Sequence, residues 1–411
     1  MADTPESIQL ELQPVQPPRR RKQNRQRIVM VATVILVVAA WIYGYISSGT
    51  DVAPLVPEVI PDATRVEVSG SLFIGYSDES DEPVGYAAVG EAPGYAGPIE
   101  MLVGIYPDGE ISGVSIVAQR ESPGFFRLIE NQEFVLQFFG KAVSDPLQLG
   151  QDIDAVSGAT TSAEAIARSV RLAARQVSAQ ALNQPLPAET RPIQIGIPEI
   201  TIVLLYGVGY VGHRLRNRQW QKRIRWLTLL TGMVVLGFIY TLPFTITMVV
   251  SLLSGFWPDW QSNLYWYLMI GGIIFVTTVD AKNPYCSWFC PFGAFQESLA
   301  KISGAKVYRP RDLNEFFTWL QRGLAFVAVL IGLLLRRPGV ASYEPFATLF
   351  DLRGTGIEWI FLGIIVIASL LMYRPFCNFL CPLDPIYEFI AAARKWVREV
   401  WRRWQKQSAK A

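Results

Sequence analysis

The sequence predicts an α+β domain that is inserted after the first helix of an otherwise all-α polytopic membrane protein with about six transmembrane helices. Hydrophobic residues make up 51% of the 411-residue chain, which is too apolar for a wholly soluble protein. Uncharged apolar stretches recur along the chain, and one long polar segment separates the first of them from the others. The net charge of only +2 gives no reason to expect a nucleic-acid partner.

The first apolar stretch, residues 28–47, carries no charge and is long enough to cross the roughly 30 Å hydrocarbon core of a bilayer as a helix. A cluster of arginine and lysine residues precedes it, so the positive-inside rule places residues 1–27 in the cytoplasm. A cleaved signal peptide is the alternative, but its apolar region is usually shorter. We therefore predict an uncleaved anchor in the membrane lipid.

The remaining candidate spans follow the polar segment, at residues 195–212, 226–246, 264–280, 320–335 and 356–373. The basic segment HRLRNRQWQKRIR between the first two is expected in the cytoplasm. Alternation then places the segments at 281–318 and after residue 374 on the cytoplasmic side as well. The predicted parts are an exoplasmic domain at 60–185, a membrane domain at 195–390 and a basic cytoplasmic tail at 391–411. In a bacterium the exoplasmic side of the inner membrane is the periplasm.

Two features fit this topology less simply. Arg336 and Arg337 would lie outside, against the usual bias of basic residues toward the cytoplasm. The stretch 243–257 is also apolar and is compatible with three arrangements: an extension of the third span, a break at Pro243, or a segment that re-enters the membrane.

The polar segment has an α+β pattern. Residues 84–92 and 99–119 are rich in β-forming residues, and the turn sequence Pro107-Asp108-Gly109 divides the second stretch into a predicted hairpin. The stretch 127–140, RLIENQEFVLQFFG, is expected to form a helix, and so is the segment that follows Ser162.

Two motifs in this segment resemble the FMN-binding domain of respiratory flavoproteins. GYAGPIEMLVGIYPDGEISGVSIVAQRESPG precedes DAVSGATTSAEAI, as in subunits of the Na⁺-translocating NADH:quinone reductase and Rnf complexes and in NosR/NirI-type membrane proteins. In that family a separate flavin transferase joins the phosphate of FMN to the threonine after Ser-Gly-Ala, which is Thr160 here. The resemblance implies further cofactor-binding residues: Asp154, Ser157, Gly158, Ala159, Thr161, Ser162, Glu121, Pro123 and Gly124. Ser122 stands where threonine is commoner.

The residue types around Thr160 suit this chemistry. Gly158 and Ala159 carry almost no side chain, so a phosphate and a modifying enzyme can approach the backbone closely. A helix that starts near Ser162 offers unpaired N–H groups and a positive dipole end to the phosphate. The alternative is that Ser157 or Ser162 merely caps this helix.

All four cysteines belong to one repeated unit. PYCSWFCPFGAFQE (284–297) and PFCNFLCPLDPIYE (375–388) align without gaps. On a helix, cysteines at i and i+4 share one face, about 5–6 Å apart between Cβ atoms. The four thiolates match the ligand count of an iron–sulfur cluster, whereas a reducing cytoplasm argues against disulfides. A four-cysteine zinc site and buried packing cysteines are the alternatives. The predicted ligands are Cys286, Cys290, Cys377 and Cys381.

The two CX3CP motifs strengthen the resemblance to NosR/NirI-type proteins, whose longer members add a cytoplasmic ferredoxin domain that we do not find in this sequence. In that respect the chain is similar to the C-type membrane flavoproteins of organohalide respiration. A single histidine, His213, rules out a di-haem cytochrome with paired histidine ligands and is expected among the arginines at the membrane surface.

The resemblance implies a membrane-bound electron-transfer flavoprotein, a redox component rather than a stand-alone enzyme. It would pass electrons from the quinol pool or another donor, through covalently bound FMN, to an exoplasmic respiratory reductase. Nitrous-oxide respiration is one candidate pathway. The alternatives are a non-redox assembly or regulatory factor for an exoplasmic enzyme, in which the cysteines are structural, and a redox sensor.

Overall fold

The polar segment folds around a five-stranded antiparallel meander. The computed structural model describes residues 19–408 except 50, 79, 122–125, 128, 130–132, 157–159, 187–192, 194, 281–282 and 306–313. Neighbouring strands pair in chain order, so each connection is a hairpin. The strands are β1 (Arg65–Ser69), β2 (Leu72–Ser77), β3 (Ser80–Pro93), β4 (Pro98–Ile105) and β5 (Ile111–Gln119).

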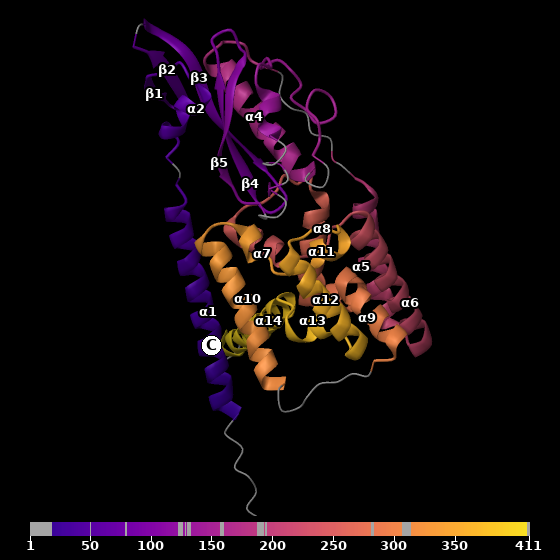
Figure 1. Cartoon of the computed structure of the whole chain (residues 1–411). Coiled ribbons are helices and arrows are strands. Elements are labelled where there is room, and N and C mark those ends of the chain that lie inside the picture. Colours follow the sequence, from indigo (N-terminus) through magenta and orange to yellow (C-terminus); the bar gives the residue numbers. More distant parts are fainter. Residues whose placement is uncertain are drawn as a thin grey trace, which may run out of the picture.

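The two faces of this sheet are covered by helices of unequal length (Figure 1). Alternate residues of β4 separate onto the two faces, as the period of two in a strand requires. Met101 and Val103 pack under the long helix α4 (Thr160–Gln180), and Leu102 packs toward the short helix α2 (Val56–Val59), which follows the 3₁₀ turn η1 (Ala53–Leu55). The sheet is therefore buried on both sides, and α4 is fixed as one wall of the domain.

The expected helix at 127–140 is wrong in its second half. Glu133 adopts a left-handed conformation with φ of 51°, which an α-helix does not tolerate in its interior. A 3₁₀ turn, η2 (Phe134–Phe138), follows it and buries Phe134 and Phe138 edge to face, with ring centroids 5.8 Å apart. Packing of these two rings under the sheet, rather than helical periodicity, decides the local conformation.

In the helical half, α1 (Arg19–Ser47) packs closely against α10 (Asn314–Leu334). These helices approach so closely at Gly44 that a Cβ atom there would lie 2.1 Å from the carbonyl oxygen of Leu333. Among the described residues, Ile28–Ser47 and Glu315–Leu334 are long and apolar enough to cross a membrane. Two shorter apolar helices are α8 (Leu264–Asp280) and α12 (Gly356–Leu371). The helix α5 (Ile197–Arg214) covers the second predicted span but is not among these candidates, so the predicted number of six spans is not confirmed.

The third predicted span, 226–246, is not one continuous helix. It consists of α6 (Arg218–Thr231) and a π-helical segment, η3 (Gly232–Ile239), and the chain then breaks before α7 (Ile246–Ser254). The expected continuous extension of the span is wrong, because the helix ends at Ile239 and a break that includes Pro243 precedes α7. Two tyrosine hydroxyls satisfy the backbone there: Tyr265 donates to the Leu242 carbonyl oxygen at 2.8 Å, and Tyr285 accepts from the Phe244 N–H at 2.8 Å.

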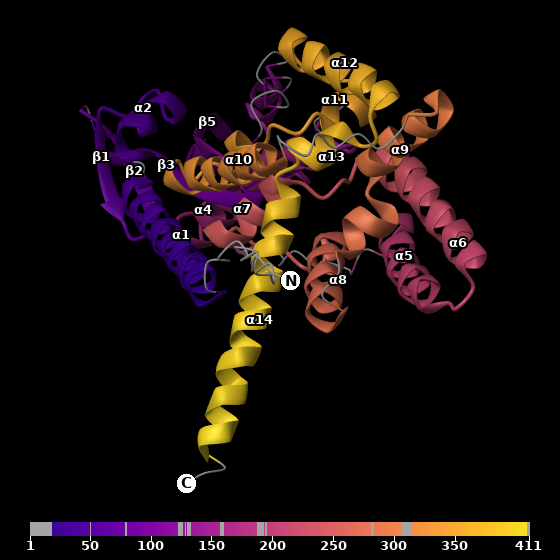
Figure 2. The same cartoon turned by 90° about the horizontal axis from the view of Figure 1, so that it is seen from below.

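The remaining elements pack between these helices around a second hydrophobic core. They are η4 (Tyr285–Phe289), α9 (Pro291–Ser303), η5 (Pro338–Ala341), α11 (Phe346–Phe350), α13 (Pro375–Phe379) and α14 (Leu383–Ser408). Seen from below, α14 runs out of the body of the protein (Figure 2).

Arg336, which was predicted to lie outside, is found beside the end of α1. Its guanidinium group stacks over Tyr45 and Phe256 and donates to Ser48 Oγ at 2.7 Å.

Candidate functional site

The predicted flavin segment meets the fold at the first turn of α4. This helix begins at Thr160, two residues earlier than expected, so Thr160 itself stands in its first turn, where N–H groups have no partner within the helix. Thr161 is exposed and Ser162 is buried. Asp154 is exposed, and its N–H donates to Gln137 Oε1 at 2.7 Å. Ser157, Gly158 and Ala159 lie outside the described residues.

Glu121 is almost fully buried, with 2% of its surface exposed. Its carboxylate accepts hydrogen bonds from the N–H groups of Tyr95, at 2.6 Å, and Ala96, at 3.3 Å. A Cβ atom at Gly94 would lie 1.9 Å from Glu121 Oε1, so only glycine allows the loop to close over the carboxylate. Glu121 therefore fixes the loop between β3 and β4. Pro123 and Gly124, its predicted partners, lie outside the described residues.

The loop that Glu121 fixes is also the place where the sheet domain touches the helical half. Ser251 of α7 donates to the carbonyl oxygen of Ala96 at 2.6 Å. Arg120 pairs with Glu100 and stacks over Phe256, 5.0 Å from its ring centroid. These contacts, with the Arg168–Asp259 ion pair at 3.8 Å, form what we call the interdomain joint.

A second buried carboxylate, Glu344, supports this joint from the helical side. It accepts from the N–H of Ile246, the first residue of α7, at 2.7 Å and from the Ser342 hydroxyl at 3.0 Å. A hydrogen-bond acceptor at a helix N-terminus satisfies an N–H group that has no partner within the helix, so Glu344 stabilises the helix that carries Ser251. Burial raises the pKa of Glu344 to about 7.

The two cysteine motifs lie together in the core of the helical half, but the members of a pair do not share one helix. Cys290 stands between η4 and α9, and Cys381 follows α13. The prediction of i and i+4 positions on a continuous helix is wrong. A proline follows each of these two cysteines, and the residue before a proline is driven out of the helical conformation. Cys290 accordingly has ψ of 117°.

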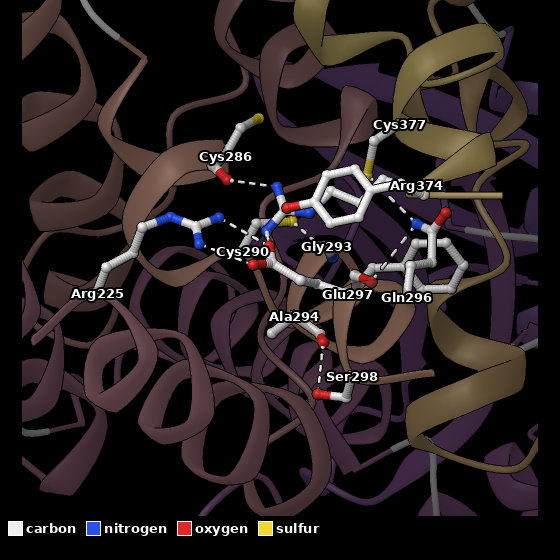
Figure 3. Close-up of polar contacts among 12 residues, drawn as sticks. Arg225, Cys286, Cys290, Gly293, Ala294, Gln296, Glu297, Ser298, Arg374 and Cys377 are labelled. Carbon is white, nitrogen blue, oxygen red and sulfur yellow. Dashed lines mark hydrogen bonds and ion pairs between the residues drawn. The ribbon is translucent and has the colours of Figure 1, made fainter. Parts of the chain in front are cut away.

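Hydrogen-bond donors surround the sulfur atoms. Gly293 N–H points to Cys290 Sγ at 3.4 Å, and Gln296 Nε2 points to Cys377 Sγ at 3.3 Å (Figure 3). Gln296 also accepts the N–H of Phe376 at 3.0 Å, so one side chain connects the first motif to the second. Both donors stabilise negative charge on sulfur.

A cationic cluster lies between the motifs. Arg374 donates to the carbonyl oxygen of Cys286 at 3.2 Å and forms an ion pair with Glu297. Arg225 holds the same carboxylate with two bonds of 2.7 Å (Figure 3). Burial alone would raise the pKa of Glu297, but Arg225 and Arg374 hold it below its usual value. Two guanidinium groups share one carboxylate, so this cluster keeps a net positive charge that can stabilise nearby thiolates.

The described residues do not form a preorganised site for a single metal ion. A zinc ion needs ligand atoms that converge to about 2.3 Å, and no three His, Cys, Asp or Glu side chains among the described residues form such a group. An iron–sulfur cluster instead spreads its cysteine ligands over several irons. Burial raises the pKa of the Cys381 thiol well above its usual value, and the nearby Cys286, Cys377 and Cys290 raise it further.

A cavity of about 180 Å³ adjoins the first motif. Ser287 and Trp288, which separate Cys286 from Cys290, form part of its wall, and His213, Lys222 and Arg225 form another part. His213 lines this cavity together with Lys222 and Arg225, and its ring centroid is 6.4 Å from that of Trp288.

Gln296, Glu297 and Arg374 were not predicted from the sequence, although a signal was present. Aligning the two cysteine motifs places Glu297 opposite Glu388 and Gln296 opposite Tyr387. The repeat therefore marked Glu297 as a position worth inspecting. It could not show that Glu297 is buried with two arginines while Glu388 pairs with Arg322 at the surface.

Comparison with protein families identifies both regions. Residues 94–175 match the FMN-binding domain, which includes Glu121 and Thr160. Residues 262–310 and 356–403 match the 4Fe-4S binding domain, and these two ranges contain all four cysteines. The chain therefore carries an FMN-binding domain and 4Fe-4S binding domains.

Individual relatives match parts of this chain. The component designated G of the ion-translocating oxidoreductase complex of Methanosarcina acetivorans is 34% identical over 137 residues, which cover 30% of this chain and 73% of that protein. The regulatory protein NosR of Pseudomonas aeruginosa is 28% identical over 222 residues, covering 50% of this chain and 30% of NosR. Protein NirI of Paracoccus denitrificans is 29% identical over 181 residues, covering 39% of this chain and 26% of NirI. The predicted resemblance is confirmed. Because its FMN-binding domain is combined with 4Fe-4S binding domains, the chain is of the NosR/NirI type. It belongs to the family of FMN-binding-domain proteins that includes component G of the ion-translocating oxidoreductase complex.

Proposed function

We propose that this protein is a membrane-bound electron-transfer flavoprotein whose FMN is attached through its phosphate to Thr160 and whose four cysteines hold an iron–sulfur cluster. The observation that carries the proposal is the arrangement of the two sites. The sheet and the start of α4 lie at one end of the upright helices, and α9 and α13 lie among these helices, farther from the sheet (Figure 1). Two redox groups at these places would form a route through the membrane.

FMN, when bound, supplies one- and two-electron chemistry, and the protein supplies position and charge. The first turn of α4 directs backbone N–H groups toward a phosphate on Thr160. Asp154, Ser157, Gly158, Ala159, Thr161 and Ser162 would form the rest of the attachment segment. Glu121, with Pro123 and Gly124, would keep the neighbouring loop closed around the flavin.

Cys286, Cys290, Cys377 and Cys381 would be the cluster ligands. Arg374 would offset the negative charge of the thiolates, and the N–H groups of Gly293 and Gln296 would tune the cluster potential through their bonds to sulfur. Electrons would enter from the quinol pool or another donor and leave through FMN to an exoplasmic reductase.

We further propose that the chain crosses the membrane about six times, with α5, α8 and α12 among the spans and the flavin domain outside. A cysteine in place of the exposed Asp81 should then react with an impermeant maleimide in right-side-out vesicles. A cysteine in place of the exposed Gln219 should react only in inverted vesicles. Labelling of both cysteines from the same side of the membrane would contradict this topology.

The attachment site is tested by in-gel flavin fluorescence of denatured protein that was co-expressed with a flavin transferase. Thr160→Ala should abolish the fluorescent band, whereas Thr161→Ala should retain it. Equal fluorescence of wild type and Thr160→Ala would remove Thr160 from the proposal. Loss of the band in Thr161→Ala alone would move the attachment by one residue.

The cluster is tested independently by iron and acid-labile sulfide analysis of protein purified without oxygen. Wild type should contain both, and Cys290→Ser or Cys381→Ser should lose most of them while the covalent flavin stays. Zinc without sulfide would favour the four-cysteine zinc site. Protein without iron, sulfide or flavin would favour the non-redox assembly factor.

A further inference from the structure

The C-terminal helix α14 consists of two parts with different surroundings. Its first turns are packed into the protein, where Leu383 and Tyr387 are buried. Arg394 still contacts α8, and Figure 2 shows the C-terminal part of α14 projecting from the body of the protein. Large hydrophobic side chains are nevertheless exposed along it, at Trp396, Val397, Val400, Trp401 and Trp404.

These exposed side chains share one face of the helix. Their spacing of i, i+1, i+4, i+5 and i+8 is that of a single apolar stripe at 3.6 residues per turn. Lys395, Arg398 and Arg402 have the same kind of spacing on the opposite face. The projecting part of α14 is therefore strongly amphipathic, with tryptophans on one side and, apart from Glu399, basic residues on the other.

The contacts of α14 fix its level in the molecule. Arg394 donates to the carbonyl oxygen of Val279 at 2.8 Å, one residue before the end of α8. Glu388 pairs with Arg322, in the first half of α10, at 2.8 Å. The end of α8 and the start of α10 are the ends that charge distribution assigns to the cytoplasmic face. Helix α14 thus crosses the helical half near that face.

The direction of α14 agrees with this level. In Figure 1 the candidate span α1 stands upright while α14 is seen nearly end-on, and the view from below shows α14 along its length (Figure 2). The two helices therefore run in clearly different directions, and α14 does not continue alongside the candidate span α1.

We propose that residues 394–404 of α14 form an interfacial helix that lies on the cytoplasmic leaflet and binds anionic phospholipid. The tryptophan and valine face would enter the boundary between headgroups and acyl chains, where tryptophan is favoured. The basic face would meet phosphate groups and the negative surface potential of the leaflet. Charge complementarity selects this occupant, because an acidic lipid surface satisfies both faces of the helix at once.

The depth of the helix is tested by photo-cross-linking of the full-length protein in vesicles of phosphatidylcholine and phosphatidylglycerol. p-Benzoylphenylalanine in place of Val400, on the apolar face, should form lipid adducts that mass spectrometry identifies. The same residue in place of Arg402, on the basic face, should form far fewer. Equal yields at the two positions, or adducts to a polypeptide at position 400, would overturn the proposal, the latter in favour of a protein partner.

The choice of lipid is tested by charge. With the photo-reactive residue at position 400, the pair Arg398→Gln and Arg402→Gln should reduce lipid adducts in anionic vesicles, because each removed charge weakens surface binding about fivefold. In vesicles of phosphatidylcholine alone the pair should have no effect. A loss of the same size in both kinds of vesicle would show that anionic lipid is not recognised.

Discussion

At the scale of single residues, Gln296 is the side chain that couples the two cysteine motifs. It donates to Cys377 Sγ and accepts from Phe376 N–H, and it belongs to the helix that follows Cys290. Because an N–H···S bond stabilises the more negative, reduced state of a cluster, Gln296→Met should lower the reduction potential. Gln296→Glu should lower it further, since it adds a negative charge. Redox titration followed by EPR measures both, and unchanged potentials would mean that this bond does not reach a cluster ligand.

Glu344 makes stability depend on pH. Burial raises its pKa to about 7 from 4.5, so the folded protein binds this proton more tightly than the unfolded chain. The stability that protonation adds is fully present below pH 4.5 and is lost as the pH rises through 7. Glu344→Gln keeps an acceptor for Ile246 N–H and removes this titration. The difference in unfolding free energy between wild type and variant should change by roughly 2–3 kcal/mol between pH 5 and 8. Parallel stability curves would contradict the assignment.

At the scale of elements, sequence patterns predicted the elements whose conformation depends on their own residues. The Pro107-Asp108-Gly109 turn is confirmed as the β4–β5 hairpin, with Gly109 at φ of 93°. The sequence could not select the break near Pro243 among its alternatives, because two tyrosine hydroxyls from distant segments stabilise it. It did not predict the 3₁₀ turn at Phe134, which depends on burial of the Phe134 and Phe138 rings. For the same reason the motifs identified four cysteines but not Arg225 or Arg374, which only the fold brings together.

The packing of α4 on the sheet gives a prediction at this scale. A Cβ atom at Gly90 of β3 would lie 1.9 Å from the carbonyl oxygen of Ser169 and 2.9 Å from Ala173 N, both backbone atoms of α4. Gly90→Ala must push the helix off the sheet and should destabilise the flavin domain by about 1–3 kcal/mol, visible in its unfolding temperature. Gly363→Ala, where a Cβ atom meets nothing within 4 Å, is the control and should leave that temperature unchanged.

At the scale of the whole molecule, the interdomain joint determines how the flavin domain stands over the helices. Ser251 reaches the loop that Glu121 closes, and Glu344 holds the start of the helix that carries Ser251. The two buried carboxylates therefore act from opposite sides of one contact. The connection between the flavin domain and the cysteine region depends on α7 as well as on the covalent chain.

Ser251→Ala tests this connection. The substitution leaves the buried carbonyl oxygen of Ala96 without the Ser251 hydroxyl, which should cost about 1–3 kcal/mol at the joint while both halves stay folded. Hydrogen exchange at residues 94–97 should accelerate accordingly, with protection of β4 and α12 unchanged. Ser254→Ala is a matched control on the same helix, since the buried Ser254 hydroxyl has no hydrogen-bond partner within the described part of the chain. If the amide hydrogens of both variants exchange at the same rate as in wild type, the Ser251 hydrogen bond does not hold the domains together. The Arg168–Asp259 ion pair would then be the more important contact of the joint.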